Sequence, residues 1–113
     1  MSQNVQEMDA MVLQGQIPQA VDRFFHPEAV TKEGDGGTTN SKGEAMTKLT
    51  GFVGSIAKVN QIKLHNQAVQ DNVTFSEFTF DFDMQDGSKI HWHEVIRREW
   101  RDGMVVAENY FQN

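Results

Sequence analysis

The sequence predicts an α+β domain in which helices come first and a sheet of long antiparallel strands follows. Apolar residues recur with helical spacing up to about residue 57, and beyond that point they alternate with polar residues. Glycine-containing turns at residues 85–87 and 101–103 divide the second half into strands. A run of helices followed by a run of strands is typical of α+β proteins.

Length and charge limit the kind of protein that this is. We expect one domain over residues 1–113, because a chain of 113 residues can bury one core but not two. The 16 acidic residues outnumber the 10 basic ones and no basic cluster is present, which argues against binding to nucleic acid or to anionic membrane surfaces. The absence of cysteine excludes disulfides, thiolate metal sites and cysteine nucleophiles. The start of the chain lacks the pattern of a signal peptide, so we expect a cytoplasmic protein.

Two short helices are expected in the first 26 residues. The first has an apolar stripe at helical spacing and is expected to end at Gly15. The stripe consists of Val5, Met8, Met11 and Val12. The second helix is expected to start near Pro18, because proline is tolerated at the first helical position. It is expected to end by His26, because Pro27 disfavours the helical conformation in the residue before it.

A third helix is expected after a short strand and a turn. The strand is predicted over residues 28–33, the glycine-rich turn over 34–37, and a few extended residues after it. Ser41 and Glu44 have the spacing of a capping box, which predicts that the helix begins there. Its apolar stripe consists of Ala45, Met46, Leu49, Phe52, Val53 and Ile56.

Four long strands are expected after the helices, over residues 58–70, 73–84, 88–100 and 104–111. The second of them alternates most clearly, which is typical of a half-buried antiparallel strand. Its apolar face carries Phe78, Phe80, Phe82 and Met84, and its polar face Glu77, Thr79, Asp81 and Asp83.

The turns predict the register of the two hairpins. A three-residue loop at 85–87, with Gly87 in the left-handed conformation, keeps both faces consistent, whereas a two-residue loop would shift the register by one. The expected pairs are Phe82–Ile90, Phe80–Trp92, Phe78–Glu94, Asp83–Lys89, Asp81–His91 and Thr79–His93. The same kind of loop at 101–103 predicts the pairs Trp100–Met104, Arg98–Val106, Ile96–Glu108 and Glu94–Tyr110.

Glu94 stands out because this register places it on the apolar face, among Phe78, Phe80 and Trp92. A carboxylate in such a place is paired, is protonated, or lines a solvated cavity. An apolar pocket raises the pKa of a carboxyl and makes it a good general acid or base near neutral pH. The alternative is a structural hydrogen bond from Glu94 to Tyr110 or to a backbone amide.

The order of elements resembles the nuclear transport factor 2-like superfamily, nearest to its SnoaL-like and ketosteroid-isomerase-like branch. The resemblance rests on the segments GQIPQAVDRFFHPEAVTKEG and DGSKIHWHEVIRREWRDGMVVAENY and covers nearly the whole chain. It implies a cone-shaped α+β barrel, with three N-terminal helices packed on a strongly curved, mostly antiparallel sheet and a pocket at the wide end. It also implies a homodimer that needs no cofactor.

Site residues follow from the resemblance position by position. Glu33 occupies the position of the carboxylate base of ketosteroid isomerases. Met8 stands where their oxyanion tyrosine would be, and their second oxyanion acid falls near Ile96, two residues from Glu94. Steroid isomerase activity is therefore not expected.

Two other branches of the superfamily point to the late strands. SnoaL-like cyclases use an acidic residue there, which is either Glu94 or Glu108 in this chain. Epoxide hydrolases of this fold use paired acids bridged by arginine, and Glu94, Arg98 and Glu108 resemble that set.

His91 and His93 alternate on one strand, so their side chains point the same way and can share a metal ion. Cupins use such a pair, but the second half of the cupin pattern is absent here. The preferred register places both histidines on the polar face, opposite Asp81 and Thr79. We expect no metal.

The sequence therefore predicts a cofactor-free acid/base isomerase, cyclase or hydrolase that acts on a small hydrophobic molecule. Glu94 and Glu33 are the expected acid and base. The expected ligand-binding residues are Trp92, Phe80, Tyr110, Phe78 and Glu108. The alternative is a non-catalytic binding module or a dimeric scaffold of the same fold.

Overall fold

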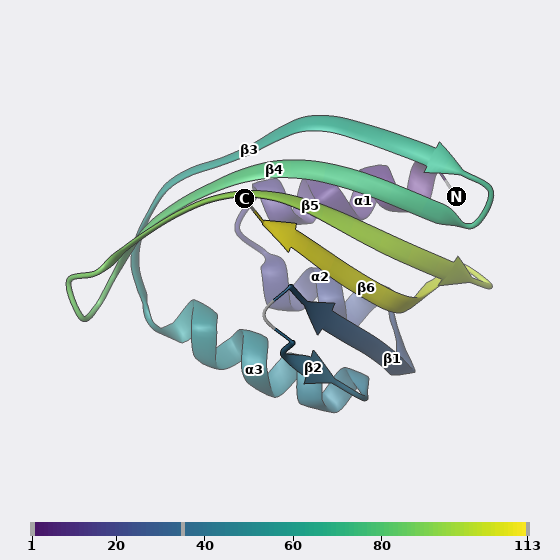
Figure 1. Ribbon diagram of the computed structural model, residues 1–113, viewed down its shortest axis with the longest axis horizontal. Helices are drawn as coiled ribbons and strands as arrows, with labels where there is room; N and C mark the ends of the chain where they lie inside the picture. The colour runs from purple at the N-terminus through teal and green to yellow at the C-terminus, as the bar shows by residue number, and fades with distance from the viewer. Residues whose placement is uncertain (1, 35, 113) are drawn as a thin grey trace.

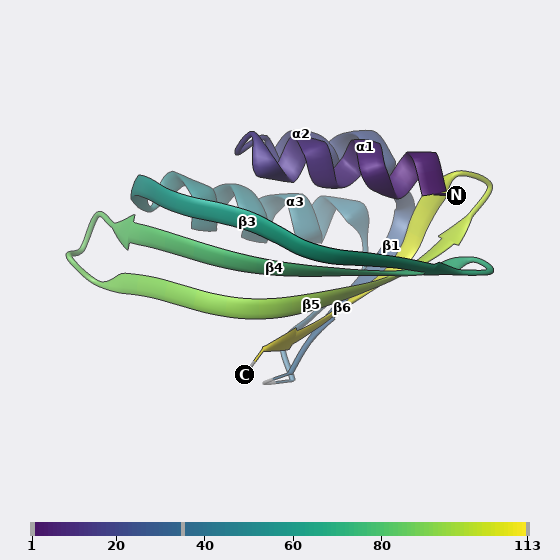
Figure 2. The same ribbon diagram turned by 90° about the horizontal axis from the view of Figure 1, so that it is seen from above.

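The computed structural model describes residues 2–34 and 36–112, which form three helices packed on one face of a six-stranded sheet (Figures 1 and 2). The helices are α1 (Ser2–Leu13), α2 (Ile17–Phe24) and α3 (Lys42–Gly54). The strands are β1 (Phe25–Glu33), β2 (Thr38–Thr39), β3 (Ile56–Gln70), β4 (Val73–Met84), β5 (Lys89–Arg101) and β6 (Met104–Gln112). The predicted α+β class and the order of elements are confirmed. Within the described ranges, no helix is long and apolar enough to cross a membrane.

The sheet is mixed and its strands run in the order β2-β1-β6-β5-β4-β3. β1 lies parallel to β6, and the other neighbouring pairs are antiparallel. β2 and β3 form the two edges, so the sheet is open and not a closed barrel. The long strands β3, β4 and β5 bend around the helices (Figure 1), which gives the concave surface that the helices cover.

The helix ends follow the expected local chemistry. α1 ends in a Schellman motif, in which the N–H groups of Gly15 and Gln16 donate to the carbonyls of Val12 (2.9 Å) and Met11 (2.9 Å), with Gly15 at φ +79°. The Ser41 hydroxyl accepts a hydrogen bond from the backbone N–H of Glu44 at 3.1 Å, as a capping box requires. α3 ends at Gly54, two residues before the last residue of its predicted stripe.

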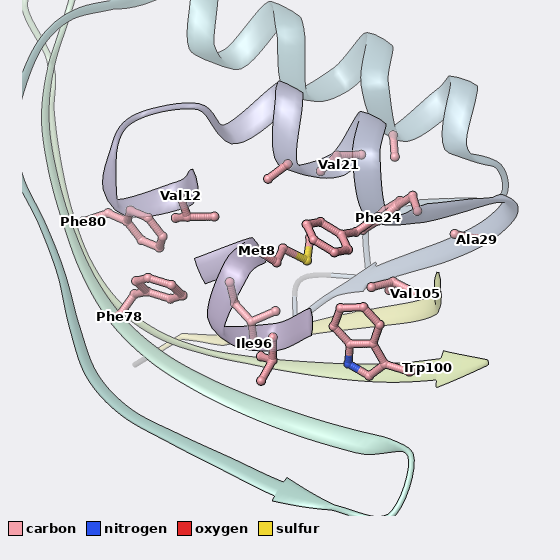
Figure 3. Packing of buried hydrophobic residues seen from close by; sticks show 14 of the residues in the cluster. Met8, Val12, Val21, Phe24, Ala29, Phe78, Phe80, Ile96, Trp100 and Val105 are labelled. Carbon is pink, nitrogen blue, oxygen red and sulfur yellow. The ribbon is translucent and has the colours of Figure 1, made fainter. Parts of the chain in front are cut away.

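The core lies between the helices and the concave face of the sheet (Figure 3). The stripe of α1 and the aromatic residues of β4 and β5 meet there, and the side chains of Met8, Phe78 and Trp100 are at most 1% exposed. The rings of Phe24 and Trp100 pack edge to face with a centroid distance of 5.9 Å, and the Trp100 indole N–H donates to Thr74 at 2.9 Å. The buried aromatic ring therefore keeps its polar atom satisfied.

The predicted register of the β4–β5 hairpin is confirmed at each predicted pair. Phe80 pairs with Trp92, Phe78 with Glu94, and Asp81 with His91. The three-residue loop places Gly87 at φ +88°, the left-handed conformation expected of it. Glu94 therefore lies on the concave face, beneath the helices.

The predicted register of the β5–β6 hairpin is wrong, by one residue at Trp100 and by two residues from Arg98 onward. Asp102 and Gly103 both have positive φ, +54° and +78°, and form a two-residue turn that pairs Arg101 with Met104. A bulge then inserts Val106, so that Arg98 pairs with Glu108.

The shorter turn alone would move the side chains of β6 to the other face, and the bulge moves them back. The side chains beyond the bulge keep their predicted face but change partners. Ile96 lies opposite Tyr110 instead of Glu108, and Glu94 lies opposite Gln112 instead of Tyr110.

Candidate functional site

A cavity of about 190 Å³ lies between the helices and the concave face of the sheet. Most of its wall is apolar and comes from both layers, which include Met8, Val12, Val21, Leu49, Phe52, Phe80, Phe82, Trp92 and Ile96. Its polar side chains are Thr31, Glu33, Thr39, Lys48, Glu94, Arg98, Glu108, Tyr110 and Gln112. The ends of β1, β5 and β6 meet here because β1 runs parallel to β6, which brings Glu33 beside Tyr110.

Glu94 is buried in the wall of this cavity, with 7% of the residue exposed. Its Oε2 accepts a hydrogen bond of 2.6 Å from the side-chain amide of Gln112. Among the described residues nothing hydrogen-bonds to Oε1 and no cation forms an ion pair with Glu94. Glu94 lines the cavity, so a carboxyl oxygen without a partner among these residues lies in the wall of a space that can admit a small molecule. The predicted place of Glu94, in the concavity and within reach of a polar partner, is confirmed.

Burial raises the pKa of Glu94 to about 7. The hydrogen bond from Gln112 opposes this shift, whereas the negative charges of Glu108 and Glu33 add to it. The positive charge of Arg98 lowers the pKa of Glu94, but by less than burial raises it. Glu94 therefore changes its protonation near neutral pH, as a general acid or base must.

Arg98 is buried on the same face of β5, four residues after Glu94, and joins two acidic residues from different layers. Its Nη1 lies 2.8 Å from Oδ1 of Asp9 on α1, and its Nε lies 2.9 Å from Oε2 of Glu108 on β6. Burial alone would lower the pKa of Arg98, but the charges of Glu108 and Asp9 outweigh it and raise the pKa. The Tyr110 hydroxyl donates to the other oxygen of Glu108. Burial, and then the charge of Glu108, raise the pKa of Tyr110 well above its usual value.

Asp9 was not among the residues that the sequence singled out, although a signal was present. It lies four residues after Val5 and three before Val12, which places an acid on the apolar face of α1. Its Oδ2 accepts hydrogen bonds from Ser76 (2.5 Å) and Gln67 (2.7 Å). The arginine bridge therefore joins Asp9 and Glu108, and the expected bridge from Arg98 to Glu94 is not formed.

Glu33 lines the cavity at the end of β1, but its environment differs from that of Glu94. Its side chain is 37% exposed and forms an ion pair of 3.0 Å with Lys48 of α3. The two proposed catalytic acids therefore share one cavity, with Glu33 at its exposed margin and Glu94 in its interior.

The predicted aromatic wall is present in part. Trp92 stacks on Phe52 with a centroid distance of 5.5 Å and an interplanar angle of 15°, and both line the cavity together with Phe80 and Tyr110. Phe78 does not line it, because its fully buried ring packs behind that of Phe80, with a centroid distance of 5.2 Å. The sequence placed Phe52 in the apolar stripe of the third helix. The stripe alone does not show that Phe52 lines the cavity.

Residues 2–34 and 36–112 contain no group of three or more histidine, aspartate or glutamate side chains placed to hold a metal ion. His91 and His93 lie on the convex face of the sheet, away from the cavity. His93 Nε2 is 2.6 Å from Glu77, and His91 Nδ1 is 3.5 Å from Asp81.

No model of a known protein family and no curated protein matches this sequence. Solved structures do match the fold. A candidate SnoaL-like polyketide cyclase from Mesorhizobium loti superposes with a TM-score of 0.87 at 15% identity, over 97% of both chains. A nuclear transport factor 2-like protein of unknown function from Burkholderia pseudomallei gives 0.82 at 14% identity, over 99% of this chain and 89% of the other.

A third similar structure comes from Catenulispora acidiphila. It is a protein with a ketosteroid isomerase-like fold in complex with trimethylamine, with a TM-score of 0.74 at 10% identity over 90% of this chain and 79% of the other. The chain thus has the cone-shaped α+β fold of nuclear transport factor 2-like proteins. The neighbours with that fold are SnoaL-like, nuclear transport factor 2-like and ketosteroid isomerase-like proteins.

Proposed function

We propose that this protein is a cofactor-free acid/base enzyme that acts on a small, largely apolar molecule held in the cavity. Glu94 is the group that exchanges a proton with this molecule. The observation that carries the proposal is that Glu94 lines a mostly apolar cavity with one carboxyl oxygen that has no partner among the described residues. A solved protein with a ketosteroid isomerase-like fold is in complex with trimethylamine, which supports a small organic molecule as the ligand.

The neighbours of Glu94 favour proton transfer over simple structural burial. A buried acid with a purely structural role is expected to have both oxygens engaged, as Asp9 and Glu108 have. Glu94 lines the cavity with one oxygen held by Gln112, and its other oxygen has no partner among the described residues. In its protonated form Glu94 can donate a hydrogen bond to a developing oxyanion, and in its ionised form it can accept a proton from carbon.

The proposal is tested by following hydrogen–deuterium exchange next to the carbonyl group of small cyclic ketones in D₂O by NMR. We expect the wild-type protein to accelerate exchange for at least one ketone that fits the cavity, and Glu94→Gln to lower that rate at least about 100-fold. The matched control is Glu99→Gln, since Glu99 lies on the convex face of the same strand and pairs with Arg97. Equal rates in wild type and Glu94→Gln would contradict the proposal.

A non-catalytic binding module is the second candidate, and one observation favours it. The other polar groups deep in the wall are engaged within the protein, because Arg98 binds two acids and the Tyr110 hydroxyl donates to Glu108. Neither Arg98 nor the Tyr110 hydroxyl is therefore free to stabilise an oxyanion. Ligand binding without proton exchange would favour this function.

The homodimer stays a prediction that the mass of the protein in solution tests.

A further inference from the structure

We propose that the cavity selects a small organic cation, such as a molecule with an ammonium group, over an uncharged molecule of the same shape. This inference rests on the site proposed above and deepens it by naming the chemical class of the ligand. It does not depend on turnover, so the two proposals can fail separately.

The side chains around the cavity carry an excess of negative charge. Four acids and two bases lie in or directly behind its wall: Asp9, Glu33, Glu94, Glu108, Lys48 and Arg98. Both bases already have acidic partners, Lys48 in Glu33 and Arg98 in Asp9 and Glu108. An anion that entered would meet an excess of negative charge, whereas a cation would find Glu94 without a counter-ion among the described residues.

The apolar wall of the cavity near Glu94 is largely aromatic. Trp92 precedes Glu94 by two residues on β5, so both side chains are on the concave face. Trp92 stacks on Phe52, and the ring of Tyr110 lines the same space. The faces of aromatic rings attract cations, and tryptophan does so most strongly. A carboxylate beside aromatic rings is therefore suited to an alkylated ammonium group.

The size of the cavity limits the size of the cation. A cavity of about 150 Å³ in a protein core holds benzene, so the 190 Å³ of this cavity fits about eight non-hydrogen atoms. Butyltrimethylammonium and 2,2-dimethylhexane each have eight non-hydrogen atoms and nearly the same shape. They differ in charge, and the charge of the quaternary ammonium does not depend on pH.

Binding of the cation is expected to depend on pH through the protein. The charged or titratable groups that face Glu94 are Glu108 and Tyr110 of β6, Arg98 of β5, Glu33 of β1 and Lys48 of α3, with Asp9 of α1 behind Arg98. The raised pKa values keep Arg98 charged and Tyr110 neutral between pH 6 and 8. Since the pKa of Glu94 is about 7, the fraction of ionised Glu94 falls about tenfold from pH 8 to pH 6, and we expect the affinity for the cation to fall with it.

The experiment measures the dissociation constants of both probes by the fluorescence of Trp92 and Trp100 and by calorimetry at pH 6 and pH 8. We expect the cation to bind at least tenfold more tightly than 2,2-dimethylhexane at pH 8, with release of a proton at pH 6. Glu94→Gln is expected to abolish this preference, and the convex-face control Glu99→Gln to retain it. Circular dichroism checks that each variant is folded, and the wild-type pH dependence tests the inference without any variant.

Equal affinity for the two probes at pH 8, or no binding of the cation, would overturn the inference. Proton exchange in ketones without any cation preference overturns the inference alone. Cation preference without proton exchange in any substrate overturns the proposed enzyme function alone.

Discussion

The guanidinium of Arg98 lies 2.8 Å from the carboxylate of Asp9, although the two residues are 89 positions apart in the chain. Both side chains are only 1% exposed. The contact joins α1 to the sheet, and the positive charge of Arg98 lowers the pKa of Glu94 slightly against the larger effect of burial. One ion pair thus serves the fold and adjusts the protonation of the site.

The first prediction concerns the loss of this ion pair. Arg98→Met removes the cation but leaves Asp9 and Glu108 buried, so we expect the free energy of unfolding to fall by about 3–5 kcal/mol. Urea unfolding followed by tryptophan fluorescence measures the change. Arg97→Met is the matched control, since Arg97 pairs with Glu99 on the convex face, and we expect a cost below about 1 kcal/mol. A cost as small for Arg98→Met would contradict the structural role given to Arg98.

The second prediction concerns the pH dependence of stability. The pKa of Glu94 rises from 4.5 to about 7 on folding, so the folded protein holds more protons than the unfolded chain in this window. Stability from this group is fully present below pH 4.5 and is lost as the pH rises to about 7. We expect the wild type to lose roughly 2–3 kcal/mol more than Glu94→Gln between pH 5 and pH 8.

The hydrogen-bonded acids of the convex face do not mask this effect. Hydrogen bonds, chiefly from Asn66 to Glu77 and from Lys89 to Asp83, lower the pKa values of these two carboxyls. Their contribution is lost only below their ordinary pKa values, outside the window of Glu94. Urea unfolding at four pH values from 5 to 8 measures both proteins, and parallel curves for wild type and Glu94→Gln would show that Glu94 does not titrate there.

The third prediction separates the two candidate acids. Glu33 is half-exposed and paired with Lys48, so Glu33→Gln is expected to lower the rate of proton exchange less than about tenfold, against at least about 100-fold for Glu94→Gln. The rate of the wild type should titrate near pH 7 and that of Glu33→Gln should keep this profile. A larger loss in Glu33→Gln than in Glu94→Gln would make Glu33 the principal acid.

The fourth prediction compares two glycines. Gly103 has φ +78° in the β5–β6 turn, and we expect Gly103→Ala to destabilise the protein by about 1 kcal/mol. Gly51 lies inside α3, and a Cβ added there meets no atom within 4 Å. Gly51→Ala is therefore expected to stabilise the protein by up to about 1 kcal/mol. Thermal unfolding measures both variants, and a stabilising Gly103→Ala would contradict the turn described here.

Much of the fold could be predicted because local signals agree with it. The capping box at Ser41, Gly15 after the first stripe and the alternation of Phe78, Phe80 and Phe82 each act within a few residues. The predicted register of the β5–β6 hairpin was wrong because the shorter turn and the bulge compensate each other in the direction of the side chains. The Asp102-Gly103 turn fits either loop length, and the bulge at Val106 has no glycine to mark it.

The site was predictable where it depends on one strand and not where it depends on several elements. Alternation alone placed Glu94 and Trp92 on the concave face. The partner of Arg98 on α1, the stacking of Phe52 on Trp92 and the exclusion of Phe78 depend on how helices cross the sheet. The spacing of residues along one element carries no information about that crossing.

The pairing of α1 with Arg98 also has a consequence for the order of folding. Asp9 is synthesised 89 residues before Arg98, and β1 finds its parallel partner only in β6, the last strand of the described chain. Until both late strands exist, the first helix carries an acid on its apolar face with no cation to bury it against. α1 and β1 can therefore be buried only after β5 and β6 have formed, and contacts between such distant parts of a chain slow its folding.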